Sequence, residues 1–213
     1  MNNWAYQRLF LAVLLSGFFI PAYSVGTGLY LGIMGGPATN SSSSQVVTTQ
    51  TPPPISTGAT PKNNQFAGRA FIGYQIGEYG GIEAGATYIS SIQYKASLPT
   101  CGGLTIRTGD IDLLGKGTYP IWNSFDVFGK AGVAISYTAI PGSFNAACKT
   151  DYQHRVRPTF SLGASYDLTQ SWVTDISWNQ ILMGSPLNNI NYFALGIAYH
   201  FVDRYCGQFL CDD

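Results

Sequence analysis

Long segments in which apolar residues occupy every second position recur through the sequence from residue 27 onward. A period of two residues is typical of β-strands, in which successive side chains point to opposite faces. We expect eight strands, over residues 27–36, 65–76, 81–92, 108–119, 124–138, 155–167, 171–182 and 190–201. A tilted strand that crosses a bilayer needs about 9–11 residues, and most of these segments are long enough.

The connections between the expected strands alternate in length. Short ones cover residues 77–80, 120–123 and 168–170, and long ones cover 37–64, 93–107, 139–154 and 183–189. Outer-membrane barrels have this arrangement, with short turns at one end and long loops at the other. The longest connection, 37–64, has a serine run, a run of three prolines and no apolar periodicity, so we expect a mobile loop rather than a linker between domains.

The amino-acid composition helps to decide whether the outer surface of the fold meets water or lipid. Charged residues make up 10% of the chain, against about 25% in an ordinary soluble domain. The single long apolar run lies at the N-terminus and is shorter than the ~20 residues of a membrane-spanning helix. Two fold classes remain compatible with the composition: a membrane β-barrel, and a secreted β-barrel or sandwich. The 11 basic residues balance the 11 acidic ones, so no nucleic-acid partner is expected.

The two faces of the strands differ in a way that favours the membrane barrel. In 190–201, large apolar residues such as Phe193 and Leu195 alternate with small ones such as Ala194 and Gly196. A soluble barrel would expose the small, weakly polar face to water, which is a poor solvated surface. A membrane barrel turns the large apolar face to lipid. We therefore predict an all-β fold, an eight-stranded antiparallel up-and-down transmembrane β-barrel.

Aromatic residues gather near the expected strand ends and indicate interfacial girdles, although aromatic residues also favour strands in general. At the short-turn end they are Tyr119, Trp122, Phe125, Tyr166, Trp172, Tyr199 and Phe201, and higher up they are Tyr88, Tyr137 and Trp178.

The N-terminal segment, residues 1–24, has the pattern of a secretory signal peptide. Arg8 precedes the apolar run 9–20, and Pro21 and the small-residue site ending at Ser24 follow it. We expect the barrel to cover residues 25–201 and a short periplasmic tail to cover 202–213.

Eight strands leave an interior that side chains just fill. The inward positions carry charges, which are Arg69, Glu83, Asp112, Lys116, Asp126, Lys130, Arg157 and Asp175. Counting residues from the nearest short turn, we expect Glu83, Lys116, Asp175 and Lys130 at similar depth, with Glu83 and Lys116 on neighbouring strands. A static network that neutralises buried charges is favoured over an ion gate, because each unpaired buried charge costs several kcal/mol.

The cysteines and histidines give little sign of catalysis. Cys101 and Cys148 fall in neighbouring long loops, and Cys206 and Cys211 fall in the tail, so two disulfides are expected in an oxidising compartment. His154 is expected in a long loop and His200 on the inner face near the last strand's end. Because no metal-ligand cluster or phosphate-binding loop occurs, we expect no catalytic residue, metal or cofactor.

Five segments resemble the transmembrane domain of the outer membrane protein A family: residues 28–36 (GLYLGIMGG), 71–88, 112–137, 161–180 and 191–201 (NYFALGIAYHF). The resemblance implies a barrel in the outer membrane of a Gram-negative bacterium, with interior charges that pair across the lumen. It also implies that the strand ending at Phe201 is read by the barrel-assembly machinery. Asp175 stands where that family commonly has a basic residue. Residues 202–213 are too short for the family's peptidoglycan-binding domain.

These observations favour a structural or surface-interaction role, in membrane integrity, adhesion or defence against host factors. The expected partners are outer-membrane lipid and lipopolysaccharide, with a host or surface ligand at the loops. A narrow, porin-like ion pore is the alternative. A lipid-modifying barrel enzyme is a third possibility, but it would need a histidine on the lipid-facing rim, which we do not find.

Overall fold

The computed structural model describes residues 27–41, 44–48, 56–62, 64–77, 79–96, 105–122, 124–141, 149–184 and 187–201. These residues form strands β1 (Gly28–Asn40), β2 (Gln45–Thr48), β3 (Ser56–Pro61), β4 (Gln65–Ile76), β5 (Gly80–Ala96), β6 (Thr105–Trp122), β7 (Phe125–Ile140), β8 (Asp151–Asp167), β9 (Trp172–Leu182) and β10 (Asn189–His200). In this part of the chain, no helix is long and apolar enough to cross a membrane.

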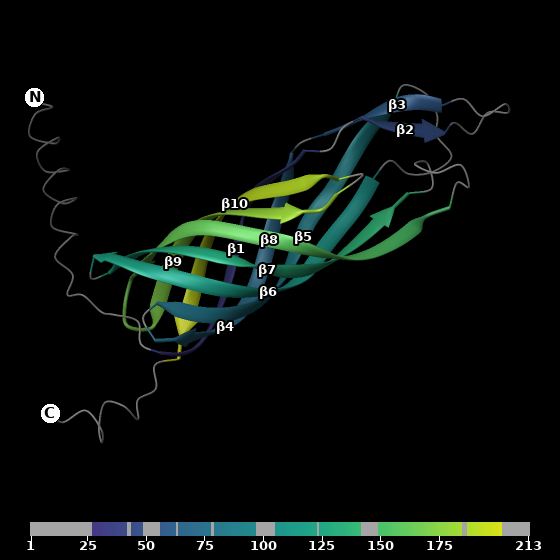
Figure 1. Ribbon diagram of the computed structural model, residues 1–213. Coiled ribbons are helices and arrows are strands. Elements are labelled where there is room, and N and C mark those ends of the chain that lie inside the picture. Colours follow the sequence, from purple (N-terminus) through teal and green to yellow (C-terminus); the bar gives the residue numbers. More distant parts are fainter. Residues whose placement is uncertain are drawn as a thin grey trace, which may run out of the picture.

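Eight of the strands close into an antiparallel barrel (Figure 1). β1 pairs with β4 on one side and with β10 on the other, and the ring closes where β5 pairs with β6. Closure satisfies the backbone of every strand without a free edge, which is the condition for a sheet to cross a bilayer. The predicted eight-stranded antiparallel barrel is confirmed.

The segment 37–64 is not the loop that its composition predicts. β1 continues to Asn40, and β2 and β3 form a hairpin within this segment. β3 then pairs with β5, with Ala59 opposite Ala96 and Thr60 opposite Lys95. The long β5 offers an edge with unpaired backbone groups above the barrel, and the short strands cover it. Pairing with a distant strand, rather than local periodicity, places the described strand β3 of this segment.

The barrel wall is uneven in height. β5, β6, β7 and β8 have 17, 18, 16 and 17 residues, whereas β9 and β10 have 11 and 12. The four long strands extend into segments expected to be loops, at what we call the long-loop end, where the β2–β3 hairpin also lies (Figure 1). The opposite, short-turn end carries Gly77, Tyr79, Ser124 and residues 168–171.

The side chains alternate between lipid-facing and lumen-facing positions as predicted. On β10, Leu195 and Phe193 are 68% and 61% exposed, whereas Ala194 and Ala198 are 2% and 5% exposed. The outer wall is therefore a continuous apolar surface, and the polar side chains of the strands are turned inward, as in other transmembrane barrels.

Candidate functional site: the lumen and its mouth

Four charged side chains form a connected cluster inside the barrel. Arg69 on β4 lies between two carboxylates, with Nη1 2.5 Å from Glu83 Oε1 and Nη2 2.6 Å from Asp112 Oδ1. Its Nε also donates to Asp112 Oδ2 at 2.8 Å. Lys130 Nζ donates to both carboxylate oxygens of Glu83, at 3.0 and 2.8 Å. The cluster spans four consecutive strands of the ring, β4 to β7, and its two positive and two negative charges cancel.

Aromatic rings enclose this cluster. The Tyr30 hydroxyl donates to Glu83 Oε2 at 3.1 Å. The Phe71 ring centroid lies 5.2 Å from Arg69 Cζ and 5.1 Å from Lys130 Nζ, within the range of cation–π attraction. All four charged side chains are nearly inaccessible to solvent. Such buried charges are tolerable because each one has an opposite partner and hydrogen bonds.

Lys116 lies close to this cluster without joining it. It is opposite Lys130 in the β6–β7 register, so two positive charges stand side by side. Lys130 takes the contact with Glu83, whereas Lys116 Nζ lies 5.3 and 5.4 Å from the ring centroids of Tyr30 and Phe128. No carboxylate of the described residues lies within ion-pair distance of Lys116. Similar depth on neighbouring strands therefore does not produce a Glu83–Lys116 pair.

The other predicted interior charges lie apart from the cluster. Asp175 is buried, and its Oδ1 has no hydrogen-bond partner. It occupies space left by Gly196, where an added Cβ would lie 2.7 Å from Asp175 Oδ2. Asp126 is half-buried at the short-turn end of β7, and Arg157 lies at the long-loop end. The structure thus brings four of the eight residues together, and a shared role for all eight stays a prediction.

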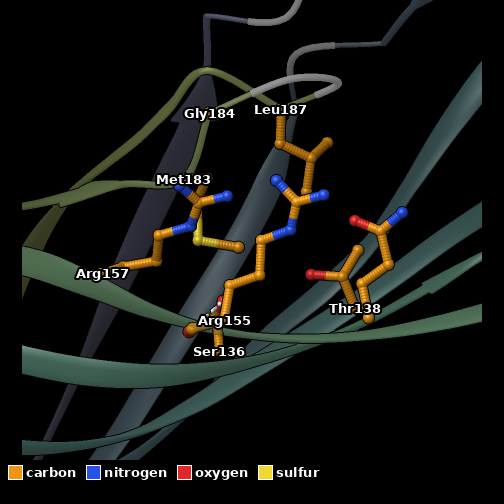
Figure 2. A pocket seen from close by; sticks show the side chains of 8 residues that line it. Ser136, Thr138, Arg155, Arg157, Met183, Gly184 and Leu187 are labelled. Atoms are coloured by element: carbon orange, nitrogen blue, oxygen red, sulfur yellow. Dashed lines mark hydrogen bonds between the residues drawn. The ribbon is translucent and has the colours of Figure 1, made fainter.

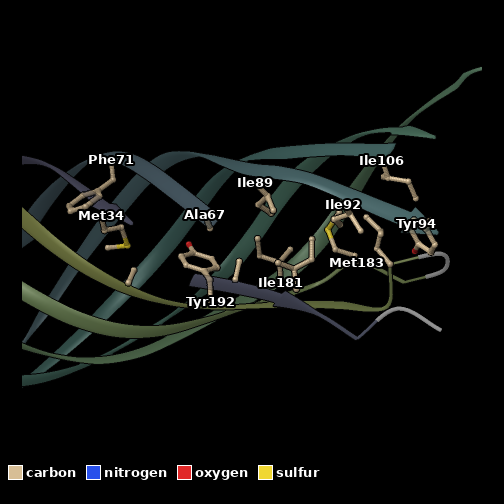
Figure 3. Packing of buried hydrophobic residues seen from close by; sticks show 14 of the residues in the cluster. Met34, Ala67, Phe71, Ile89, Ile92, Tyr94, Ile106, Ile181, Met183 and Tyr192 are labelled. Carbon is tan, nitrogen blue, oxygen red and sulfur yellow. The ribbon is translucent and has the colours of Figure 1, made fainter. Parts of the chain in front are cut away.

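The half of the lumen nearest the long-loop end is mixed, because large apolar side chains lie there beside buried polar ones such as Thr108, Ser136 and Thr138. The apolar side chains form a set on the side of β5, β6, β9 and β10, as Figure 3 shows for Ile89, Ile92, Ile106 and Met183. We call this set the apolar plug and define it as Ile89, Ile92, Ile106, Ile181, Met183, Leu187 and Ile190.

Two local features place these residues inside. The β5–β6 register shifts between Ile89 and Ile92, so both side chains point inward although they are three positions apart. The β9–β10 connection also turns into the mouth, where Met183 and Leu187 are 4% and 1% exposed. Gly184 adopts a φ of +72° at this turn, a conformation that favours glycine. Regular alternation along the sequence gave no signal for either feature.

A basic pocket lies beside the plug at the mouth of the barrel (Figure 2). Arg155 and Arg157 project from β8 toward the β9–β10 connection, next to Ser136 and Thr138 of β7. Arg157 Nε is buried without a hydrogen-bond partner, and no described carboxylate forms an ion pair with either arginine. Two neighbouring guanidinium groups without a counter-charge are suited to bind an anion.

The two histidines are placed differently from each other. His154 lies in β8 rather than in a loop, because β8 begins at Asp151, and its ring contacts Tyr137 edge-on at 4.9 Å. It faces outward near the long-loop end, so the expectation that no histidine lies on the lipid-facing rim was wrong. His200 is buried and stacks on Tyr30 at 4.7 Å. Within the described part of the chain, no three His, Cys, Asp or Glu residues form a potential metal site.

Some predictions fall on residues that the structure does not describe. They are the proposed signal peptide, the tail, and the four cysteines Cys101, Cys148, Cys206 and Cys211. These stay predictions.

The closed barrel, its apolar outer wall and its paired interior charges agree with the sequence comparison. The family model of the outer membrane protein beta-barrel domain matches residues 10–201. The chain belongs to this family. Like its relatives, this outer membrane barrel is located in the outer membrane of Gram-negative bacteria.

Curated relatives match mainly over the barrel. An uncharacterised protein of Coxiella burnetii is 29% identical over 175 residues, which cover 67% of this chain and 71% of that protein. Outer membrane protein A of Serratia marcescens is 26% identical over 156 residues, covering 69% of this chain and 42% of that protein. The chain therefore spans less than half the length of this outer membrane protein A.

Solved structures share the fold of this outer membrane barrel. Neisserial surface protein A superimposes with a TM-score of 0.56 at 14% identity, covering 82% of this chain and 97% of that one. OprG of Pseudomonas aeruginosa superimposes with a TM-score of 0.51 at 15% identity, covering 84% and 99%. Similarity at this level of identity concerns the fold alone.

Proposed function

We propose that this outer-membrane barrel is a surface-interaction protein with a closed lumen, which strengthens the membrane and presents its long-loop end to a ligand. In barrels of this class the short turns face the periplasm and the longer loops face the outside. The long-loop end is thus the end that meets the surroundings of the cell.

The observation that carries the proposal is the filling of the lumen at two levels. The cluster of Arg69, Glu83, Asp112 and Lys130 occupies the lower level, and the apolar plug occupies the upper one. An ion on this path would have to separate buried ion pairs and then pass beside the apolar plug, whose side chains cannot replace the ion's water and so oppose conduction. A continuous ion pore, the alternative function, is therefore less well supported.

The long-loop end has the features of an interaction surface. The walls of β5–β8 and the β2–β3 hairpin extend beyond the shorter strands and enlarge the surface available to a partner. At the mouth, Arg155 and Arg157 have no acidic partner among the described residues. We infer that the ligand is acidic, because an anion would supply the missing counter-charge.

Two measurements test this function. In planar bilayers, we expect no stable single-channel steps from the purified protein. Stable steps whose ion selectivity changes in Glu83→Gln would support the pore instead.

For the surface role, we would measure binding of a sulfated polysaccharide to proteoliposomes. Double substitution of Arg155 and Arg157 by Gln should weaken binding by about 10-fold or more, because a charge-assisted contact contributes about 1.5–3 kcal/mol. Lys62→Gln, which removes an exposed charge at the same end, is the control. Equal weakening in the control would indicate attraction by general charge, and unchanged binding in the double variant would contradict the proposed site.

A further inference from the structure

A groove lies on the outer wall of the barrel near the long-loop end. It has a volume of about 310 Å³ and is lined from β5 to β8 by Tyr88, Arg107, Gly109, Tyr137, Tyr152 and His154, among others. The groove and the basic pocket share Thr138 and Gln153 of the wall between them, but the arginines of the basic pocket, Arg155 and Arg157, do not line the groove. It faces the medium that surrounds the barrel, which at this height is the membrane or its surface.

Strand register explains why a groove forms here. Tyr88, Gly109, Tyr137 and His154 lie directly opposite one another on four successive strands, and so form one row across the wall. Tyr88 and Tyr137 are 67% and 42% exposed, and Gly109 between them has no side chain. The missing side chain leaves a hollow between two rings, and the edge-on contact of Tyr137 with His154 closes its far side.

The row lies at the edge of the apolar band. On β6, Tyr119 and Trp122 are exposed near the short turn, and the outward side chains of Leu113 and Ile111 follow toward the other end. About ten residues separate Tyr119 from Gly109, which at 3.4 Å per residue and a tilt of about 40° is roughly 26 Å of height. The apolar band of such barrels is about 25 Å tall, so the groove lies at the level of the headgroups.

Cationic and polar groups border the groove on the side away from the apolar band. Arg107 lies one outward position beyond Gly109, and Tyr152 lies in the same row as Arg107, with Ala139 between them. No described carboxylate forms an ion pair with Arg107 or His154. The groove thus combines an apolar, aromatic trough with an uncompensated positive charge above it.

We propose that this groove binds a phosphorylated acyl lipid of the outer leaflet. The acyl chain lies along the hollow over Gly109, against the rings of Tyr88 and Tyr137. The phosphate accepts hydrogen bonds from the Arg107 guanidinium and from His154. Guanidinium groups bind phosphate oxygens in a forked geometry, and tyrosine rings are suited to the boundary between chains and headgroups. A free phosphate would use only the rim of this groove and leave its apolar floor unused.

Native mass spectrometry of the detergent-solubilised protein can test the proposal, with diphosphorylated lipid A as the probe. We expect one lipid A to remain bound to the unmodified chain. The double variant Arg107→Gln, His154→Gln should bind it at least 10-fold more weakly, and Arg107→Lys should retain part of the affinity. Tyr88→Ala should also weaken binding, because it removes one wall of the trough. Lys95→Gln, an exposed cation on β5 outside the groove, should have no effect.

Two further measurements show how much of the affinity depends on the phosphates of lipid A and whether phosphate alone is enough. Dephosphorylated lipid A should bind the unmodified chain at least 10-fold more weakly, and millimolar inorganic phosphate should not displace lipid A. The heat-dependent shift in gel mobility confirms that each variant is folded. Equal binding of both lipids, equal effects of Lys95→Gln and the double variant, or displacement by inorganic phosphate would each overturn the proposal.

Discussion

Glu83 on β5 and Lys130 on β7 are joined across the strand that separates them, because Lys130 Nζ donates to both carboxylate oxygens of Glu83. Arg69 approaches the same carboxylate from β4. One acidic side chain thus links strands on both sides of the β5–β6 pairing that closes the ring. These buried, paired charges occupy the interior of the barrel, and their contribution to the free energy of unfolding can be measured.

Replacing Glu83 by glutamine should strongly destabilise the barrel. The substitution keeps the shape of the side chain but removes the negative charge that Arg69 and Lys130 share. Breaking a buried ion pair in this way costs about 3–5 kcal/mol. Urea unfolding in phospholipid vesicles gives the free energy of unfolding. Asp126→Asn, at a half-buried position without an ion pair in the described chain, should change it by less than about 1 kcal/mol. Similar values for both variants would show that the cluster adds no stability of its own.

Replacing Leu195 by arginine tests the lipid-facing wall. Leu195 is 68% exposed and lies opposite Gly35 on β1 and Ile176 on β9. A charge near the bilayer midplane of such a barrel destabilises it by about 2–4 kcal/mol. Leu195→Phe, which stays apolar, should have little effect in the same unfolding assay. A tolerated arginine would mean that this position does not face the hydrocarbon.

Truncating Leu187 should loosen the mouth of the barrel. Its side chain is 1% exposed in the apolar plug, and removing a buried leucine to alanine costs about 2–5 kcal/mol. We expect faster hydrogen exchange in residues 181–190, while exchange in the strands around Glu83 changes little. Leu168→Ala, at a 44% exposed leucine of a short turn, is the control. Unchanged exchange near residue 187 would show that the plug does not hold this connection.

Epitope insertion can establish the orientation of the barrel. An epitope placed after Thr150, in the connection before β8, should be detected by antibody on intact cells. The same epitope after Thr169, in the turn between β8 and β9, should be detected only after the outer membrane is permeabilised. The reverse pattern would invert the assignment of the two ends and remove the basis of the surface role.

The pairing of Cys101 with Cys148 stays a prediction that peptide mapping can decide. The connection that contains Cys101 precedes β6 and the one that contains Cys148 follows β7, and β6 and β7 are paired strands of the wall. A disulfide needs Cα atoms about 4.4–6.8 Å apart, which neighbouring loops can reach. Mapping without reduction, on protein alkylated at harvest, should give one peptide with both cysteines. Free thiols at both positions would refute the bridge without affecting the barrel.

The sequence by itself determined the number of barrel strands, which face of each strand points outward, and that this outer face meets lipid. These properties depend on a period of two residues, which is local and can be read at positions such as Ala194 and Leu195. The low charge then required that the large apolar face meet lipid. The alternation of short and long connections determined the two ends in the same way.

Only the tertiary structure decided which interior groups meet. Lys130 rather than Lys116 reaches Glu83, although the register sets the two lysines side by side, and Glu83 and Lys130 are 47 residues apart in the chain. The apolar plug depends on a register shift at Ile92, and the outer groove depends on Gly109 lying opposite two tyrosines. Register is a relation between strands, set by all pairings around a closed ring, and no local pattern specifies it.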